Sequence, residues 1–188
     1  MKINLKMVRL SFPDHWIAKA FEEGQSKKYG NTLLIEPDSA NDKLIRRTLA
    51  QVASEKQGWE KNHAKILAAA LAKNSGKEVC YWEGDTKEYD GYAGMMALTS
   101  KRDESKGRPL IIDKDKSPLT EADGKPYAGC FINASVEIWA QDNKWGKTLR
   151  CELLGVQFAA DGDAFSAGSV ADEADFDDLS DSGDEDLA

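Results

Sequence analysis

The sequence is poor in the residues that would mark a disulfide-bonded or metal-binding protein. Among 188 residues there are three cysteines and two histidines. The cysteines, at positions 80, 130 and 151, are odd in number and far apart, which excludes a disulfide framework and a CxxC metal or redox motif. His15 and His63 lie outside any Cys/His cluster, so a zinc site has little support. We therefore expect no metal, no cofactor and a reducing compartment.

Long apolar runs are also missing. The longest, such as 66–72, fall well short of the roughly 18 residues that a membrane-spanning helix requires. Residues 1–10 interleave Lys2, Lys6 and Arg9 with apolar residues, whereas a signal peptide needs an uninterrupted apolar block. We expect a cytoplasmic protein, in the host cytoplasm if its source is viral, with no membrane partner.

Common enzyme motifs are absent as well. Glycines 91 and 94 form no GxxxxGK[ST] or GxGxxG element, and there is no GxSxG elbow. Five aspartates that could bind a divalent ion lie in turn-like stretches, where Asp is favoured for backbone reasons: Asp85, Asp90, Asp113, Asp115 and Asp123. We predict that the protein is not an enzyme; a metal-dependent nuclease built on these aspartates stays open as an alternative.

The charge is divided unevenly along the chain. Eleven of the 33 acidic residues lie between Asp161 and the C-terminus, where there is no Lys or Arg, although the whole chain carries −8. Residues 1–160 therefore hold 22 acids and 25 bases, a net charge of about +3. Such asymmetry indicates an electrostatic partner for one part of the chain.

Periodicity predicts a mainly β protein with a helical insertion. Alternation predicts strands at 8–12, ended by Pro13 and Asp14, and at 29–35. Helical spacing follows at 41–73, with Ser39 as the helix start and Gly58 as a break. Four further strands are predicted at 95–100, 110–112, 130–140 and 148–158, with a hairpin turn at 143–146 that makes the last two antiparallel.

Strand 130–141 assigns its side chains to two different faces. One row is wholly apolar and is predicted to be core: Cys130, Ile132, Ala134, Val136, Ile138 and Ala140. The other row mixes aromatic and polar residues, as expected where rings stay accessible for stacking on unpaired bases: Phe131, Asn133, Ser135, Glu137, Trp139 and Gln141. The alternative is that Trp139 packs under a loop or at a homodimer interface.

Basic residues recur beside aromatic residues in the β half, which suits a single nucleic-acid strand. Cations neutralise phosphates, and flat rings stack on bases. The predicted DNA-binding residues are Tyr29, Trp82, Tyr92, Lys101, Arg102, Arg108, Phe131, Trp139, Lys144, Trp145, Lys147 and Arg150. Each tryptophan taken alone is also compatible with a place in the core.

Several short segments together resemble one family. They are 125–130 (Lys-Pro-Tyr-Ala-Gly-Cys), Asn133, Trp139-Ala140, Gly146, 154–158 (Leu-Gly-Val-Gln-Phe) and 161–163 (Asp-Gly-Asp). This pattern resembles the tailed-phage single-stranded DNA-binding proteins. The resemblance implies an OB-type β-barrel that coats single-stranded DNA in replication or recombination, without catalysis.

The C-terminal segment 166–188 is predicted to be a disordered acidic tail, because it cannot bury enough apolar surface to offset the entropy of ordering. It resembles the tails of bacterial and phage single-strand binding proteins, which dock replication partners and compete with DNA for the basic groove. The residues predicted to contact a partner are Phe176, Asp184, Glu185, Asp186 and Leu187. The chain departs from that pattern because no aromatic residue lies at its end. A simple solubility appendage is the alternative.

The sequence thus predicts an OB-like antiparallel barrel at 1–165, with a helical insertion near 41–73, and an acidic tail at 166–188. The predicted function is sequence-independent binding of single-stranded DNA, with replication or recombination proteins as partners of the tail. The alternative is a phage virion or assembly protein that uses Trp139 and Trp145 at a protein interface.

Overall fold

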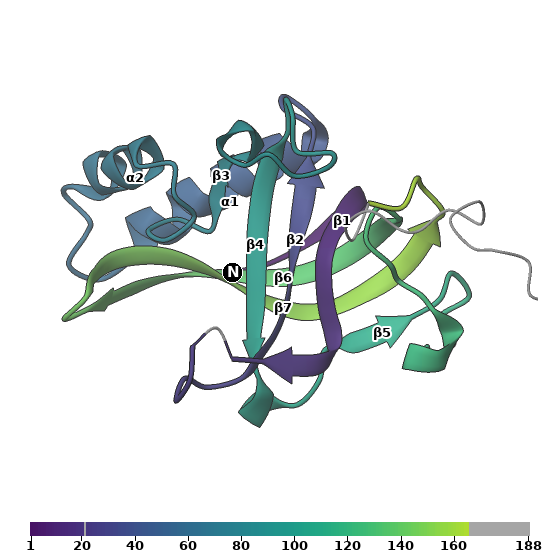
Figure 1. Ribbon diagram of the computed structural model, residues 1–188. Helices are drawn as coiled ribbons and strands as arrows, with labels where there is room; N and C mark the ends of the chain where they lie inside the picture. The colour runs from purple at the N-terminus through teal and green to yellow at the C-terminus, as the bar shows by residue number, and fades with distance from the viewer. Residues whose placement is uncertain (21, 166–188) are drawn as a thin grey trace, which may run out of the picture.

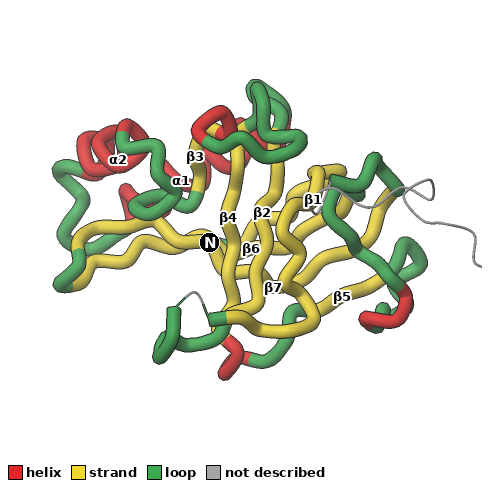
Figure 2. Tube along the Cα trace, in the orientation of Figure 1, coloured by secondary structure: helices red, strands yellow, loops and turns green. Residues whose placement is uncertain are grey.

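Seven strands form one curved sheet, with two helices beside it (Figures 1 and 2), in a computed structural model that describes residues 1–20 and 22–165. The sheet order is β3-β4-β2-β1-β6-β7-β5. The strands are β1 (Lys2–Lys19), β2 (Lys28–Ile35), β3 (Tyr81–Glu83), β4 (Met96–Asp103), β5 (Leu110–Ile112), β6 (Phe131–Asn143) and β7 (Gly146–Ala160). The helices are α1 (Ala40–Glu55) and α2 (His63–Ala72). The predicted β+α class is confirmed.

The sheet curls until its ends meet at residues 78–83. The Leu149 amide in β7 donates to the Glu78 carbonyl at 2.7 Å, and the Cys80 amide donates to the Leu149 carbonyl at 2.9 Å. On the other side, the Thr99 amide in β4 donates to the Cys80 carbonyl at 2.9 Å, and β3 pairs with β4. Residues 78–83 therefore join β4 to β7 and close an OB-like barrel.

The sequence predicted a wholly antiparallel barrel, and this prediction is wrong for one pair of strands. β5 pairs with β7 in parallel, and Val79 makes an isolated parallel bridge with Leu149. The β6–β7 hairpin is antiparallel, with Asn143 opposite Gly146, as predicted. The parallel pair arises because the 104–130 connection carries β5 to the outer edge of β7, where no hairpin constrains its direction.

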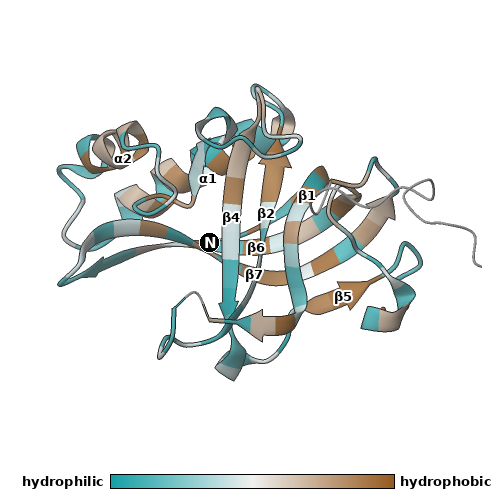
Figure 3. Ribbon diagram, viewed as in Figure 1, coloured by the Kyte–Doolittle hydropathy of each residue, from teal (hydrophilic) through white to brown (hydrophobic). Residues whose placement is uncertain are grey.

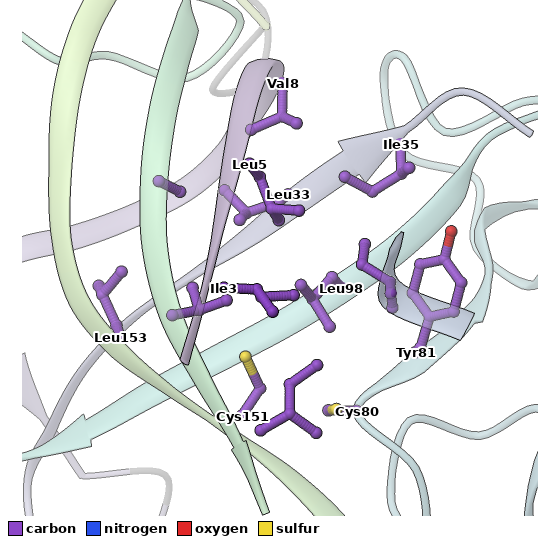
Figure 4. Close-up of a cluster of buried hydrophobic side chains, with 14 of the residues drawn as sticks. Ile3, Leu5, Val8, Leu33, Ile35, Cys80, Tyr81, Leu98, Cys151 and Leu153 are labelled. Atoms are coloured by element: carbon purple, nitrogen blue, oxygen red, sulfur yellow. The ribbon is translucent and has the colours of Figure 1, made fainter. Parts of the chain in front are cut away.

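The barrel interior is filled by the apolar rows of the strands. The predicted core row of β6 is buried from Cys130 to Ile138, each residue at most 3% exposed, and Ala140 packs partly buried against the cluster. Leu5, Leu33, Leu98 and Leu153 meet these residues from the other strands (Figure 4). Each large side chain buried in this cluster stabilises the barrel by roughly 1.5 to 3 kcal/mol.

Strand β1 is longer than predicted and does not end at Pro13. It pairs with β6 through Lys2–Arg9 and with β2 through Arg9–Lys19, so it bends around the barrel. The register shifts between Leu5 and Val8 and again after Ser11. Proline is tolerated at such a bulge, because no ladder hydrogen bond depends on its missing amide.

The helical insertion begins and breaks where predicted. The Ser39 hydroxyl accepts from the Asp42 amide at 3.2 Å, which caps α1, and Gly58 takes a φ of +84° between the helices. The indole of Trp59 is buried and donates to Asp142 at 2.9 Å. The connection between the helices therefore holds the outer part of the β6–β7 hairpin (Figure 1).

Residues 161–165 pack back onto the barrel after β7. Arg9 donates to the Asp163 carbonyl at 2.9 Å, and the Phe165 amide donates to the Ala128 carbonyl at 3.0 Å. Gly129 is required here, because its φ is +100° and a Cβ would lie 2.1 Å from the Asp163 oxygen. The predicted tail, 166–188, lies outside the described residues.

Both helices that the structure describes fall short of the length and apolar character needed to cross a bilayer.

His15 lies in the core rather than at a chemical site. It is 0% exposed, and its Nε2 lies 3.0 Å from the Asn31 amide nitrogen, while the Ser100 hydroxyl donates to the Asn31 carbonyl at 2.5 Å. Burial lowers the pKa of His15 from 6.5 to about 4, against a smaller opposing effect of the Asp14 charge.

We expect the protein to lose stability as the pH falls from 7 to 5, because the unfolded chain binds a proton at His15 and the folded chain does not. The free energy of unfolding should fall by about 2 kcal/mol from this group alone. Urea unfolding at several pH values measures the slope. In His15→Gln, which cannot titrate, the slope should flatten; an equal slope in both proteins would contradict the assignment.

Candidate nucleic-acid interface

Two neighbouring hollows lie over one side of the barrel. One hollow of about 420 Å³ lies over β4, β6 and β7, and a second of about 290 Å³ lies over the start of β2 and the preceding Gln25 and Ser26. Lys28 and Lys101 line both hollows, so the two are adjacent. We call the two hollows together the furrow. Its other aromatic and basic lining residues are Lys19, Tyr29, Lys106, Trp139 and Arg150.

The cations of the furrow come from strands that are distant in sequence. Lys28 begins β2, Lys101 lies opposite Gly30 in the β2–β4 ladder, and Arg150 is on β7. A Cβ on Gly30 would lie 3.5 Å from Cγ of Lys101, so the lysine stem runs close over the β2 backbone. The end of β4 that carries Lys101 is hydrophilic, in contrast to its apolar beginning (Figure 3).

The positive charges around Lys101 repel one another. Removal of its ammonium from water lowers the pKa of Lys101, and the charges of Lys28 and Arg150 lower it further. Asp103 and Glu152 also line this part of the furrow, and Glu152 is paired with Arg102 and Lys106. An anion placed between Lys28, Lys101 and Arg150 would relieve their repulsion.

Trp139 and Arg150 form a cross-strand pair on the outer face of the β6–β7 ladder. The Trp139 side chain is 38% exposed, and Arg150 is half-buried. The row alternation predicted from the sequence therefore holds, since the neighbours Ile138 and Cys151 point into the core. A ring beside a guanidinium offers one surface for a base and one for a phosphate.

The hairpin carries a second exposed indole beyond the barrel. Trp145 is 82% exposed at the tip, and the Lys144 ammonium lies 4.9 Å from the centre of its ring. Lys147 instead stabilises the β6–β7 hairpin, which we call the arm. Its ammonium pairs with Asp142 at 2.5 Å and lies 5.3 Å from the ring centre of Trp59. Trp145 and Lys144 are thus presented on a supported arm rather than on a free loop.

Two of the predicted aromatic contacts are buried, which corrects that prediction. Trp82 is 9% exposed and Tyr92 is 1% exposed; both pack on Leu34 and Ala97 outside the main core. The Trp82 indole donates to the Thr99 hydroxyl at 3.1 Å. Tyr92 packs against Trp82 with ring centres 5.9 Å apart, so neither ring is accessible to a base.

Three further predicted residues lie outside the furrow. Arg102 pairs with Glu152 at 2.7 Å and donates to the carbonyls of Gly107 and Lys106, which makes it a structural residue. Arg108 lies 5.1 Å from the ring centre of Trp16. Phe131, at the far end of β6, lies under the Arg9 guanidinium.

Lys28 and Lys106 are absent from the predicted contacts. Alternation along strand 29–35 places Lys28 on the same face as Gly30, and this signal could have identified Lys28. Lys106 follows β4 in a single-turn helix, Glu104–Lys106, and no periodicity marks it.

Three of the turn aspartates accept hydrogen bonds from backbone amides. Asp85 accepts from the Gly94 amide at 2.8 Å, Asp115 from the Ser117 amide at 2.9 Å, and Asp123 from the Thr120 amide at 2.7 Å. Within residues 1–20 and 22–165, no three His, Cys, Asp or Glu side chains are grouped as metal ligands would be.

Comparison with known proteins reveals close similarity to phage proteins. The family described as Enterobacter phage Enc34, ssDNA-binding protein, matches residues 1–187. Protein p50 of Acyrthosiphon pisum secondary endosymbiont phage 1 is 43% identical over 189 residues, which cover 100% of this chain and 98% of that protein.

Two solved structures share the fold. The single-stranded DNA-binding protein from bacteriophage Enc34, in complex with ssDNA, is 23% identical with a TM-score of 0.71, over 88% of this chain and 89% of that chain. The single-stranded DNA-binding protein gp2.5 of bacteriophage T7 is 13% identical with a TM-score of 0.52, over 98% of each chain.

Proposed function

The chain belongs to the family of the Enterobacter phage Enc34 ssDNA-binding protein, and we propose that it binds single-stranded DNA along the furrow without reading its sequence. The observation that carries the proposal is the union of Lys28, Lys101 and Arg150 with the accessible ring of Trp139 in one channel. Phosphates look alike and every base has a ring face, so such a channel is indifferent to sequence.

The position of the furrow supports this proposal. OB-folds bind oligonucleotides over their second and third strands and between the loops that join strands 1–2 and 4–5. Counted along the barrel, these are β2, β4, the connection from β1 to β2 and the β6–β7 hairpin. The furrow follows these elements in turn, and the exposed Trp145 stands at the hairpin end.

We propose that the protein coats and protects single-stranded DNA during phage replication or recombination, in the host cytoplasm and without catalysis. The relatives that share its family or fold are phage proteins. DNA-coating proteins need affinity for any sequence more than specificity, and stacking with phosphate neutralisation supplies that affinity.

The acidic tail has a proposed role of its own. Nine acidic residues and no base occur in 166–188, while residues 1–160 carry about +3. The described chain ends at Phe165, against Ala128 and Arg9. We infer that the tail competes with DNA for the furrow and docks replication proteins through Phe176, Asp184, Glu185, Asp186 and Leu187.

Arg150→Ala should weaken oligo-dT binding, measured by quenching of tryptophan fluorescence. Loss of one phosphate contact should reduce the slope of log affinity against log salt by about 0.7. Trp139→Ala should cost about 1 to 3 kcal/mol without changing that slope. The matched controls are Arg47→Ala, which removes the same charge from exposed α1, and Leu110→Ala, which removes an exposed apolar side chain from β5.

Wild-type protein that gives no quenching and no mobility shift at low salt would refute DNA binding. Equal effects of Arg150→Ala and Arg47→Ala would refute the furrow as its location. A stable oligomer unaffected by oligonucleotide would instead favour an assembly protein.

DNA binding should weaken above neutral pH more than a fixed-charge site would. Since the pKa of Lys101 is lowered in the protein without DNA, and a bound phosphate favours the charged form, binding takes up a proton once the pH approaches that lowered pKa. Calorimetry in two buffers of different ionisation enthalpy measures this uptake. Lys101→Arg keeps the charge but cannot titrate, so it should bind DNA with the uptake reduced; undiminished uptake would contradict the role of Lys101.

Deleting residues 166–188 should tighten DNA binding at low salt. The gain should shrink as salt rises, because the Debye length falls from about 10 Å at 0.1 M to about 3 Å at 1 M. A full-length variant with its nine tail acids changed to Asn or Gln separates charge from length. Affinity that is the same for wild type and both variants at every salt concentration would show that the tail does not compete.

A further inference from the structure

Phe12 is turned out of the barrel by the bulge in β1. Side chains alternate along a strand, so Phe12, two residues after the buried Leu10, would ordinarily face the core. Instead the register shifts after Ser11, Phe12 takes a φ of +48°, and its ring is 50% exposed. A bulky residue in the left-handed region is strained, and such strain concentrates at functional positions.

The outward ring meets a second exposed aromatic residue. Tyr89 is 49% exposed, and its ring centre lies 5.1 Å from that of Phe12, with the planes 76° apart. Buried Tyr92 supports both rings from beneath, at 6.4 Å from Phe12 and 5.3 Å from Tyr89. The two exposed rings form the walls of a right-angled corner, which opens into a hollow of about 580 Å³.

This hollow continues the furrow. It is lined by Asp14 and Lys19, and the same two residues line the smaller hollow of the furrow, at the start of β2. A strand that follows the furrow from the hairpin past Lys101 and Lys28 therefore reaches the aromatic corner next.

We propose that Phe12 and Tyr89 form a further base-binding site, which takes a nucleobase from the end of the same DNA strand. The inference rests on the proposed function. A flat base can stack on one ring while its edge meets the other, an arrangement that aromatic pairs favour.

The charges at the corner fit a base better than a phosphate. Asp14 and Asp90 line the hollow, and Asp14 is paired with Lys19. Carboxylates repel a phosphate but accept hydrogen bonds from the amino groups of bases. Phe165, the last described residue, also lines the hollow, and the same carboxylates disfavour the acidic sequence that follows it.

Two oligonucleotide lengths separate the corner from the rest of the furrow. OB-folds cover about 4 to 16 nucleotides, so an oligo-dT of about 5 should fill the central furrow alone and one of about 12 should reach the corner. Phe12→Ala and Tyr89→Ala should each weaken binding of the longer strand by about 5-fold to 100-fold. Binding of the shorter strand should not change.

A fluorescent base placed in the DNA tests the contact with Phe12 and Tyr89 directly. 2-Aminopurine placed at successive positions of the longer strand should be quenched near one end by wild-type protein, and this quenching should be lost in Tyr89→Ala. Phe12→Tyr keeps a ring and should restore binding. Leu110→Ala, an exposed apolar residue on β5, should affect neither length. Tyr89 lies in a loop, so its variant tests the proposal even if Phe12→Ala perturbs β1.

The outcomes distinguish this inference from the function on which it rests. If wild-type protein binds neither length, both fail. If it binds both lengths, and neither variant changes the affinity ratio of the two strands, only the corner is refuted. A change in self-association of the full chain with an unchanged ratio would assign the corner to a protein contact, which also refutes the proposal.

Discussion

The closure of the barrel through residues 78–83 is the constraint on which the candidate site depends. Cys80 receives a hydrogen bond from β4 and donates one to β7, so it fixes the separation of two strands that do not pair with each other. This link, together with the ion pair between Arg102 on β4 and Glu152 on β7, brings Lys101 and Arg150 to the same hollow. The shape of the furrow therefore depends on backbone hydrogen bonds as well as on the charged residues that line it.

The position of each charged group decides whether it holds the fold or faces the solvent. Glu152 is 8% exposed and sits between Arg102 and Lys106, where the pairs offset the cost of burying its charge. Lys28, Lys101 and Arg150 instead crowd one another, which is unfavourable for the free protein. Proteins tolerate such crowding where a ligand of opposite charge relieves it. Residues 1–160 are only weakly basic in total, yet three of their cations lie together at the furrow.

Local patterns in the sequence were sufficient to predict much of the fold. The Ser39 cap, the Gly58 break, the two-faced strand β6 and the hairpin at 143–146 all depend on neighbours within a few residues, and the structure has each of them. The course of β1 beyond Pro13 and the parallel pairing of β5 depend on tertiary contacts, which no local pattern records. The same limit applies to the site. Trp139 and Arg150 follow from alternation, whereas the burial of Trp82 and Tyr92 results from the 84–95 loop folding over β2 and β4.

The β6–β7 arm connects its strands through only Lys144 and Trp145, with Asn143 opposite Gly146. Side-chain direction reverses at every residue of a strand. Each strand of the arm can therefore be lengthened or shortened by two residues and still present its rings and cations on the same side. A change of one residue would exchange inside for outside from that point to the tip. Natural variation in the reach of this arm should therefore come in even steps, while the barrel beneath it stays unchanged.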